Sequence, residues 1–216
     1  DVQLLTKRPE NITRMVPPAW LAPGGWPAHV WVGTTVEDQK RAEQRIPELL
    51  KVPARVRFLS CEPLLEAVDL DPPLCPYCRD GGEVQRIERE RDAYFWCVRC
   101  ESEAVFGNWL DPCADERQSG ISWVIVGGES GPGARPFALE WARDIVTQCR
   151  EAGVACFVKQ MGDNPTISGE RVRFVAHHGA DPAEWEPGLR VQEFPSPCKV
   201  TAERALGTLP GMENGR

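Results

Sequence analysis

The stretch that decides the fold runs from residue 123 to residue 159: WVIVG at 123–127, LEWARDIVTQCREA at 139–152, and ACFVK at 155–159. The two outer segments are nearly continuous apolar runs, which is typical of parallel strands covered on both faces. The middle segment is amphipathic, with one helical face made of Ala142, Ile145, Val146 and Cys149. Gly153 follows it as a stop signal. The stretch therefore predicts a strand–helix–strand unit.

Apolar runs of this kind occur five times, at Val2 to Thr6, Val30 to Gly33, Val56 to Ser60, Trp123 to Gly127 and Ala155 to Lys159. Their starts are 28, 26, 67 and 32 residues apart, and removing 40 residues from the long gap leaves 27. A second amphipathic helix is expected after Glu37, with a kink or restart at Pro47. Strand and helix alternating at this period predict an α/β fold with a parallel sheet. The period fits both a partial (β/α) barrel that lacks its first strands and a complete, open five-stranded sheet.

The length of 216 residues and the composition, 42% hydrophobic and 26% charged, are those of one ordinary globular domain or of one domain that carries a small insert. No apolar run approaches the ~18 residues of a membrane span, and no signal segment opens the chain. We therefore expect a cytoplasmic protein that does not contact a membrane. The net charge of −7 argues against a broad nucleic-acid-binding surface. Because Asp1 leads directly into an apolar run, we expect a fragment of a longer chain.

The 40 interrupting residues, Leu74 to Cys113, contain two CxxC motifs separated by eighteen residues. Two such motifs at this separation are a strong signal for a tetrahedral zinc site. Its ligands would be the four thiolates of Cys75, Cys78, Cys97 and Cys100. An insert this small lacks a core of its own, so zinc would supply most of its folding free energy. The sequence predicts an inserted zinc ribbon with structural Zn²⁺.

The ribbon can be a structural staple or a surface for nucleic acid or protein. Five arginines in it are balanced by five carboxylates, whereas phosphate binding needs surplus positive charge. The structural interpretation is therefore favoured, and nucleic-acid binding stays possible without support from charge.

Cys149 and Cys156 fall on predicted apolar faces and are interpreted as core residues. Cys113 and Cys198 are uninformative.

Polar residues follow each of the five predicted strands. Parallel strands end at a common edge of the sheet, where ligands bind in α/β folds. The predicted substrate-binding residues at this edge are Lys7, Arg8, Glu37, Glu62, Gly127, Gly128, Glu129, Lys159 and Gln160. Three cationic and three carboxylate side chains on one rim suit a charged small molecule and proton transfer.

The opposing interpretation is that such loops are polar because they cap helices. Glu37 fits that explanation, but Glu62 precedes a proline and Glu129 lies in a glycine-rich turn, so a binding site is favoured. The glycine run can bring backbone N–H groups to an anionic ligand. His29 and His177-His178 have no metal-ligand spacing to a partner and are interpreted as incidental.

Five segments carry a family resemblance: Leu5 to Glu10, Trp31 to Gln39, Ser60 to Leu65, Val124 to Pro136 and Phe157 to Gln160. In this order they resemble the phage-associated three-cysteine-motif proteins, a radical-SAM-like domain family of unknown function found in phages and bacteria. The resemblance covers residues 1–70 and 121–162. The chain beyond Asp163 departs from the family pattern, except loosely at Glu193-Phe194-Pro195.

The resemblance implies a TIM-type partial (β/α) barrel, S-adenosylmethionine as cofactor, and a 4Fe–4S cluster on three cysteines near the N-terminus. Those cysteines would precede Asp1, so this chain alone is not expected to hold the cluster or generate a radical. Radical-SAM enzymes carry a Gly-Gly-Glu on an early strand. Gly127-Gly128-Glu129 lies on a late strand and is not equated with it. The zinc ribbon resembles an embellishment present in only some relatives.

The sequence thus predicts a partial barrel at residues 1–73 and 114–165, a zinc ribbon at 74–113, and an irregular tail at 166–216. The leading hypothesis is a fragment of a phage or bacterial radical-SAM-like protein that keeps the substrate-side strand ends. Its substrate and reaction are unknown, and the chain alone is expected to be inactive. The alternative is a non-enzymatic zinc-ribbon module that contacts nucleic acid or a partner protein. Exposed sheet edges predict self-association of the fragment.

Overall fold

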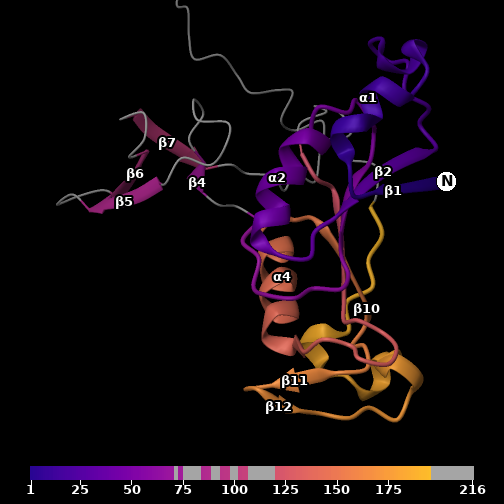
Figure 1. Cartoon of the computed structure of the whole chain (residues 1–216), viewed down its shortest axis with the longest axis vertical. Coiled ribbons are helices and arrows are strands. Elements are labelled where there is room, and N and C mark those ends of the chain that lie inside the picture. Colours follow the sequence, from indigo (N-terminus) through magenta and orange to yellow (C-terminus); the bar gives the residue numbers. More distant parts are fainter. Residues whose placement is uncertain (71–72, 75–83, 89–92, 98–101, 107–119, 196–216) are drawn as a thin grey trace, which may run out of the picture.

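The computed structural model describes residues 1–70, 73–74, 84–88, 93–97, 102–106 and 120–195, with side chains for 1–70 and 120–195 (Figure 1). Its main element is a five-stranded sheet with the order β1-β2-β3-β8-β10. These strands are β1 (Val2–Thr6), β2 (Val30–Thr35), β3 (Arg57–Cys61), β8 (Trp123–Gly127) and β10 (Ala155–Gln160). The α/β class with a mostly parallel sheet is therefore confirmed.

Every neighbouring pair in this sheet is parallel, and the strand order follows the chain order. The register places Gly33 beside Phe58 and Phe58 beside Trp123. All five residues of β3 are buried, as its continuous apolar run predicts. Parallel pairing throughout brings the carboxyl ends of all five strands to one edge of the sheet.

The described residues include three α-helices, namely α1 (Ile12–Met15), α2 (Gln39–Leu49) and α4 (Leu139–Ala152). Asp38 caps α2 by accepting a hydrogen bond from the backbone N–H of Arg41 at 2.8 Å. The helix does not restart at Pro47, because this proline falls in its last turn and the backbone N–H of Leu50 still reaches the carbonyl of Ile46. As predicted, Gly153 ends α4 in the left-handed conformation, with φ of 70°.

One face of the sheet packs against α2 and α4, which lie on the same side of it in Figure 1. The apolar stripe of each helix meets alternate strand residues there. The contributions are Ala42, Ile46 and Leu49 from α2, Ala142, Ile145, Val146 and Cys149 from α4, and Val32, Leu59, Val124, Val126, Cys156 and Val158 from the strands. This layer is the hydrophobic core.

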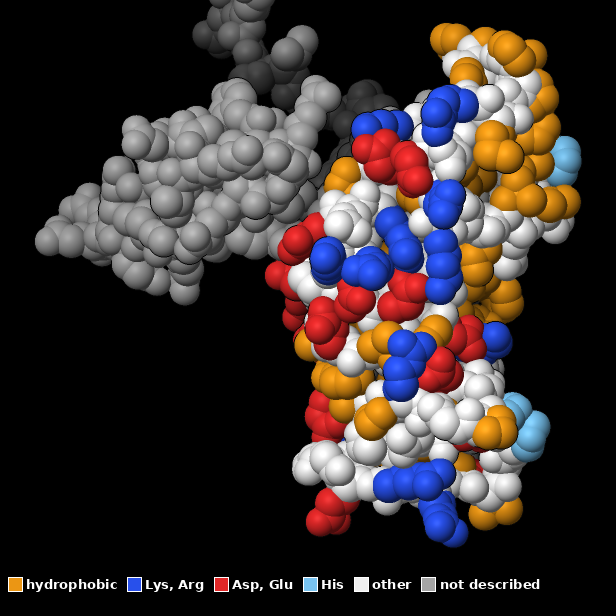
Figure 2. Space-filling model, in the orientation of Figure 1, with side chains coloured by type: hydrophobic (Ala, Val, Ile, Leu, Met, Phe, Trp, Pro, Cys, Tyr) orange, Lys and Arg blue, Asp and Glu red, His pale blue; other side chains and the backbone are white. Residues whose placement is uncertain are grey.

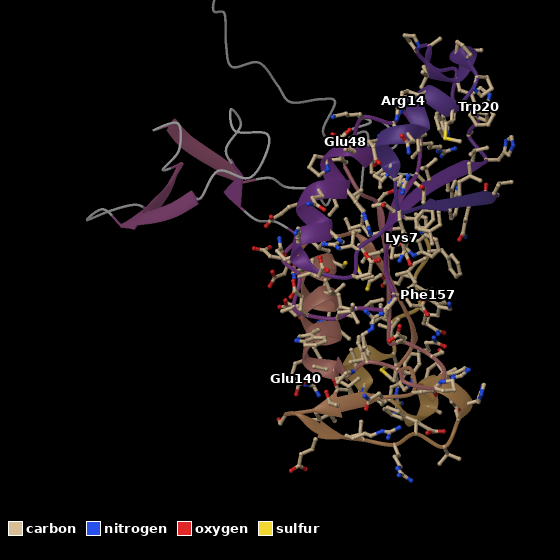
Figure 3. The ribbon with its side chains drawn as sticks, viewed as in Figure 1. Lys7, Arg14, Trp20, Glu48, Glu140 and Phe157 are labelled. Carbon is tan, nitrogen blue, oxygen red and sulfur yellow. The ribbon has the colours of Figure 1, made fainter. Side chains whose placement is uncertain are left out.

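The opposite face of the sheet carries an aromatic cluster around Trp123. Its ring centroid lies 5.9 Å from that of Trp31, 5.6 Å from Phe58, 6.4 Å from Phe157 and 5.5 Å from Phe194. The indole N–H of Trp123 donates to the carbonyl of Glu193 at 2.9 Å. Phe157 points to the side of the sheet away from α4 (Figure 3). The sheet therefore separates an aliphatic layer from an aromatic one.

The outer edge of β10 is covered, whereas the sequence predicts it to be exposed. The backbone N–H of Val158 donates to the carbonyl of Val191 at 2.8 Å, and that of Glu193 to the carbonyl of Cys156 at 2.9 Å. Residue 157 forms an antiparallel bridge with residue 192. The correction has a simple cause, because the segment beyond the last strand returns to pair with it. Within the described residues no strand pairs with the outer edge of β1, where Val2, Leu4 and Leu5 are about half exposed.

The segment after β10 contains regular elements up to residue 195, although the sequence suggests an irregular tail from residue 166. A three-stranded sheet combines β9 (Phe137–Ala138), β11 (Pro165–Ile167) and β12 (Glu170–Arg171). Short 3-10 helices follow, η3 (His177–Gly179), η4 (Pro182–Glu184) and η5 (Pro187–Leu189), after η1 (Pro9–Asn11) and η2 (Pro18–Leu21) earlier in the chain. Trp185 and Leu189 are buried in the main core.

The insert forms its own antiparallel sheet with the order β4-β7-β6-β5. Its strands are β4 (Pro73–Leu74), β5 (Val84–Glu88), β6 (Ala93–Cys97) and β7 (Ser102–Phe106). Three of the predicted zinc ligands, Cys75, Cys78 and Cys100, lie outside the described residues. Cys97 ends β6, and its side chain is not described. No helix in the described ranges is long and apolar enough to cross a membrane.

The aromatic layer leaves no space for a side chain at Gly33. A Cβ atom there would lie 2.4 Å from the ring of Phe58, which is 2% exposed and held against Trp123. We expect Gly33→Ala to lower the free energy of unfolding by about 1–3 kcal/mol, the usual cost of overpacking. Denaturant unfolding measures this. Gly188→Ala is the matched control, since nothing lies within 4 Å of the added atom. Equal stability of the two variants would contradict the packing described.

Candidate functional site

The parallel sheet brings the predicted rim residues to its carboxyl edge, where all the charged ones except Arg8 join separate ion-paired groups. Lys7 follows β1, Glu37 follows β2, Glu62 follows β3, Glu129 follows β8, and Lys159 lies near the end of β10. Acidic and basic side chains are interspersed over this part of the molecule rather than gathered into patches of one sign (Figure 2). The rim is therefore a row of compensated charges.

The central group forms around Glu62 and joins two strands that are not neighbours. Lys159 Nζ lies 3.0 Å from Glu62 Oε2, and Gln160 Nε2 donates to Glu62 Oε1 at 2.9 Å. Because β8 lies between β3 and β10, the Glu62 side chain reaches across the end of β8. Gln160 Nε2 is also 2.8 Å from the hydroxyl oxygen of Ser130, in the loop after β8. The structure thus brings together three strand ends around one carboxylate.

Glu62 and Lys159 differ in exposure, which matters for binding. The Glu62 side chain is only 16% exposed, whereas that of Lys159 is 53% exposed. A carboxylate withdrawn from water needs close donors, and both of its oxygens have one here. A half-exposed lysine loses little when it exchanges one anionic partner for another. Lys159 is therefore the more accessible member of the pair.

A second group surrounds Glu37 at the ends of β1 and β2. Lys7 Nζ lies 2.7 Å from Oε1, and Arg45 donates to Oε2 at 2.6 Å and to the carbonyl of Thr35 at 2.7 Å. Burial raises the pKa of Glu37, but the hydrogen bond from Lys7 and the charges of Arg45 and Lys7 outweigh it and lower the pKa. Arg45 lies on α2, so the argument from strand ends does not identify it as a partner of Glu37.

A third group pairs Glu129 with Arg135, six residues later. The guanidinium donates to both carboxylate oxygens, at 2.9 and 2.7 Å, and the backbone N–H of Arg135 donates at 2.9 Å. These bonds, the side-chain one first, lower the pKa of Glu129 to about 2 and raise the pKa of Arg135. Glu129 therefore stays ionised at neutral pH. Arg135 is a partner that the strand-end argument did not identify.

Gly128 follows β8, and its backbone N–H is engaged within the protein rather than free for a ligand. The backbone N–H of Gly128 donates to the carbonyl of Gln160 at 3.1 Å. A Cβ atom on Gly128 would lie 2.3 Å from the carbonyl oxygen of Met161. Glycine is required here because the loop packs directly against the backbone that follows β10. Arg8 is exposed and joins none of the three groups.

A fourth group, which the sequence reasoning missed, follows β10. His178 Nδ1 lies 2.9 Å from both carboxylate oxygens of Asp163, and the backbone N–H of Gly131 donates to Asp163 as well. The Gly131 bond, and then the His178 bond, lower the pKa of Asp163. His178 has a positive φ of 57°, which is uncommon outside glycine. The adjacent histidines were the only signal in the sequence.

The cysteines whose side chains are described do not lie on the rim. Cys61, Cys149 and Cys156 are buried in the aliphatic layer and form no disulfide. Burial raises the pKa of Cys61, and a hydrogen bond with Cys156 together with burial raises that of Cys149. Within residues 1–70 and 120–195, no three His, Cys, Asp or Glu side chains are placed to hold a metal ion. These thiols are core residues.

Comparison with known proteins gives one match. The family model described as "Protein of unknown function (DUF5131)" matches residues 1–195. No curated protein matches the chain, and no solved structure matches it.

The Arg135–Glu129 pair makes a prediction about titration. Since the folded-state pKa of Glu129 lies near 2, below its ordinary value of 4.5, the pair stabilises the fold above pH 4.5 and loses this effect as the pH falls toward 2. We expect Arg135→Gln to return the pKa of Glu129 most of the way to its ordinary value, as followed by NMR of the carboxyl carbon. Arg143→Gln is the control, because Arg143 pairs with Glu186 instead. An unchanged pKa in Arg135→Gln would refute the assignment.

Proposed function

This chain belongs to the DUF5131 family, and we propose that the carboxyl edge of its parallel sheet binds a ligand that carries an amino group and a carboxylate. In this proposal the sheet is the later part of a radical-SAM-like, TIM-type partial (β/α) barrel, and the edge is its substrate side. One observation carries the proposal: the carboxylate of Glu62 meets Lys159 and Gln160 across the end of β8.

The sheet topology supports a partial barrel over an open doubly wound sheet. A doubly wound sheet reverses its strand order and carries helices on both faces. Here the strand order follows the chain, and α2 and α4 lie on one side (Figure 1). The other face carries the aromatic cluster around Trp123, as expected of a face turned toward a barrel interior filled by side chains.

The chemistry of the central group indicates the ligand class. A ligand amine can replace the ammonium of Lys159 at Glu62, while the ligand carboxylate pairs with the released Lys159. Gln160 keeps its hydrogen bond to Glu62 during this exchange and so holds the carboxylate in place. The exchange keeps every charge compensated, which a ligand of a single charge would not do. Amino acids and molecules that end in an amino acid group belong to this class.

S-adenosylmethionine ends in such a group, and the rim residues fit its methionine end. Glu62 would take the amino group and Lys159 the carboxylate. When bound, the cofactor would supply its reactive sulfonium centre. The described cysteines do not fit an iron–sulfur cluster, because all three are buried in the aliphatic layer and form no group placed to hold a metal ion. We therefore derive no radical step for this chain.

For the insert, we propose a structural zinc ribbon. Cys97 and Ser102 are paired across β6 and β7, so the second CxxC motif begins at the hairpin between these strands. Leu74 pairs with Val105, and β4 runs antiparallel to β7, toward the end where Ser102 lies. The strands that flank both motifs thus lead to the same end of the small sheet. This placement supports a shared four-cysteine metal site.

The ligand proposal is tested by isothermal titration calorimetry of the complete chain with S-adenosylmethionine and with L-methionine. We expect both to bind, and Glu62→Gln to weaken binding about tenfold or more through loss of a charged hydrogen bond. Lys159→Met should weaken binding similarly. Glu48→Gln should leave binding unchanged, since Glu48 lies on α2 and pairs with Lys51 just beyond the helix (Figure 3). Failure of both probes to bind, or equal affinity in Glu62→Gln, would sink the proposal.

The zinc proposal predicts one zinc ion per purified chain by elemental analysis. Cys78→Ser and Cys97→Ser should each abolish it, and chelation should unfold the insert while the parallel sheet remains folded. Cys198→Ser serves as the control because Cys198 belongs to neither CxxC motif. A purified chain without bound metal, folded identically with and without chelator, is the opposing result.

A further inference from the structure

The group around Asp163 and His178 borders an open pocket of about 400 Å³. Its walls come from the segment after β10, from β11 and β12 with the residues that follow them, and from η3. Among its lining residues are Asp163, Arg171, Arg173 and His178. None of them belongs to the rim described above. The volume is that of a small-molecule site.

The charge of this lining favours an anion. The lining contains two arginines and one aspartate, so its net charge is positive before any proton on His178 is counted. The carboxylate of Asp163 already accepts the N–H of Gly131 and lies against His178 Nδ1, so its charge is partly satisfied within the protein. An incoming anion thus meets surplus donors.

The arginines differ in how strongly they are engaged. Arg171 donates to the carbonyl of Asp163 at 2.7 Å, which fixes part of its guanidinium. Arg173 is exposed, and in the part of the chain that the structure describes it forms no hydrogen bond or ion pair. All five of its N–H donors are therefore available. Between the two arginines, Val172 packs against the core, and both arginines line the pocket.

His178 adds a third polar group from another direction. Its Nδ1 carries the ring proton toward the carboxylate of Asp163, which only accepts, so Nε2 of the neutral ring can accept a hydrogen bond from a ligand hydroxyl. Its φ is positive, a backbone conformation that costs energy outside glycine and that clusters at binding sites. The backbone N–H of Gly162 donates to the carbonyl of His178 at 2.9 Å and ties the strained residue to the end of β10.

We propose that this pocket binds a phosphate group, through the guanidinium groups of Arg171 and Arg173 and the imidazole of His178. A phosphate offers acceptor oxygens to the two arginines and, when it carries one proton, a hydroxyl that His178 Nε2 can accept. A planar carboxylate would be satisfied by one guanidinium fork. The phosphate can come from inorganic phosphate or from a phosphate monoester, and the site does not depend on the ligand of the rim.

The test is calorimetric titration of the complete chain with inorganic phosphate and, separately, with ribose 5-phosphate. We expect binding of at least one probe, weakened about tenfold or more in Arg173→Gln. Stronger binding of ribose 5-phosphate would assign a monoester, and stronger binding of inorganic phosphate the free ion. Because Arg173 has no partner in the described structure, its replacement should leave thermal unfolding unchanged. This keeps a loss of binding distinct from a loss of fold.

Two control variants make the result specific. Arg150→Gln removes an exposed arginine at the end of α4, and Glu62→Gln removes the central rim carboxylate. Both should bind the phosphate probes as the unmodified chain does. Failure of the rim proposal would leave this pattern intact. Absence of binding by both probes, or an equal loss in Arg150→Gln and Arg173→Gln, would overturn the phosphate site.

Discussion

Parallel pairing of five strands in chain order is the constraint on which the rest of this structure depends. It carries residues from distant parts of the sequence to one edge, because each parallel strand must start again from the opposite end of the sheet. Glu62 and Gln160 are 98 residues apart in the chain and 2.9 Å apart at that edge. The rim and the pocket beyond it both begin at this edge.

The two faces of the sheet are covered in different ways. Aliphatic side chains of α2, α4 and alternate strand residues make a water-free layer that fixes the strands. The aromatic layer is closed instead by a late segment, since Trp123 donates to the carbonyl of Glu193 and Phe194 packs on the same rings. That segment also covers the edge of β10. Side chains therefore pack on both faces of the sheet. Such packing keeps the strand ends in place, as a ligand site built on them requires.

The strands, α4 and the convergence of Glu62 with Lys159 could be predicted because they follow from apolar runs and from the geometry of parallel sheets. Arg45 and Arg135 could not, since each lies on a helix or loop whose path around the carboxylate only the folded chain defines. The close packing of Gly128 against Met161 could not be predicted either, because it depends on the path of the chain after β10. Asp163 and His178 were missed because their pairing depends on the left-handed backbone conformation of His178. No local sequence pattern predicts that conformation.

The central claim is the meeting of three strand ends around Glu62, and NMR measures it directly. The account predicts nuclear Overhauser contacts from the side-chain amide protons of Gln160 to the methylene protons of both Glu62 and Ser130. Such contacts follow from the order β3-β8-β10 with all three strands parallel. A well-folded chain whose Gln160 amide shows neither contact would contradict the shared edge.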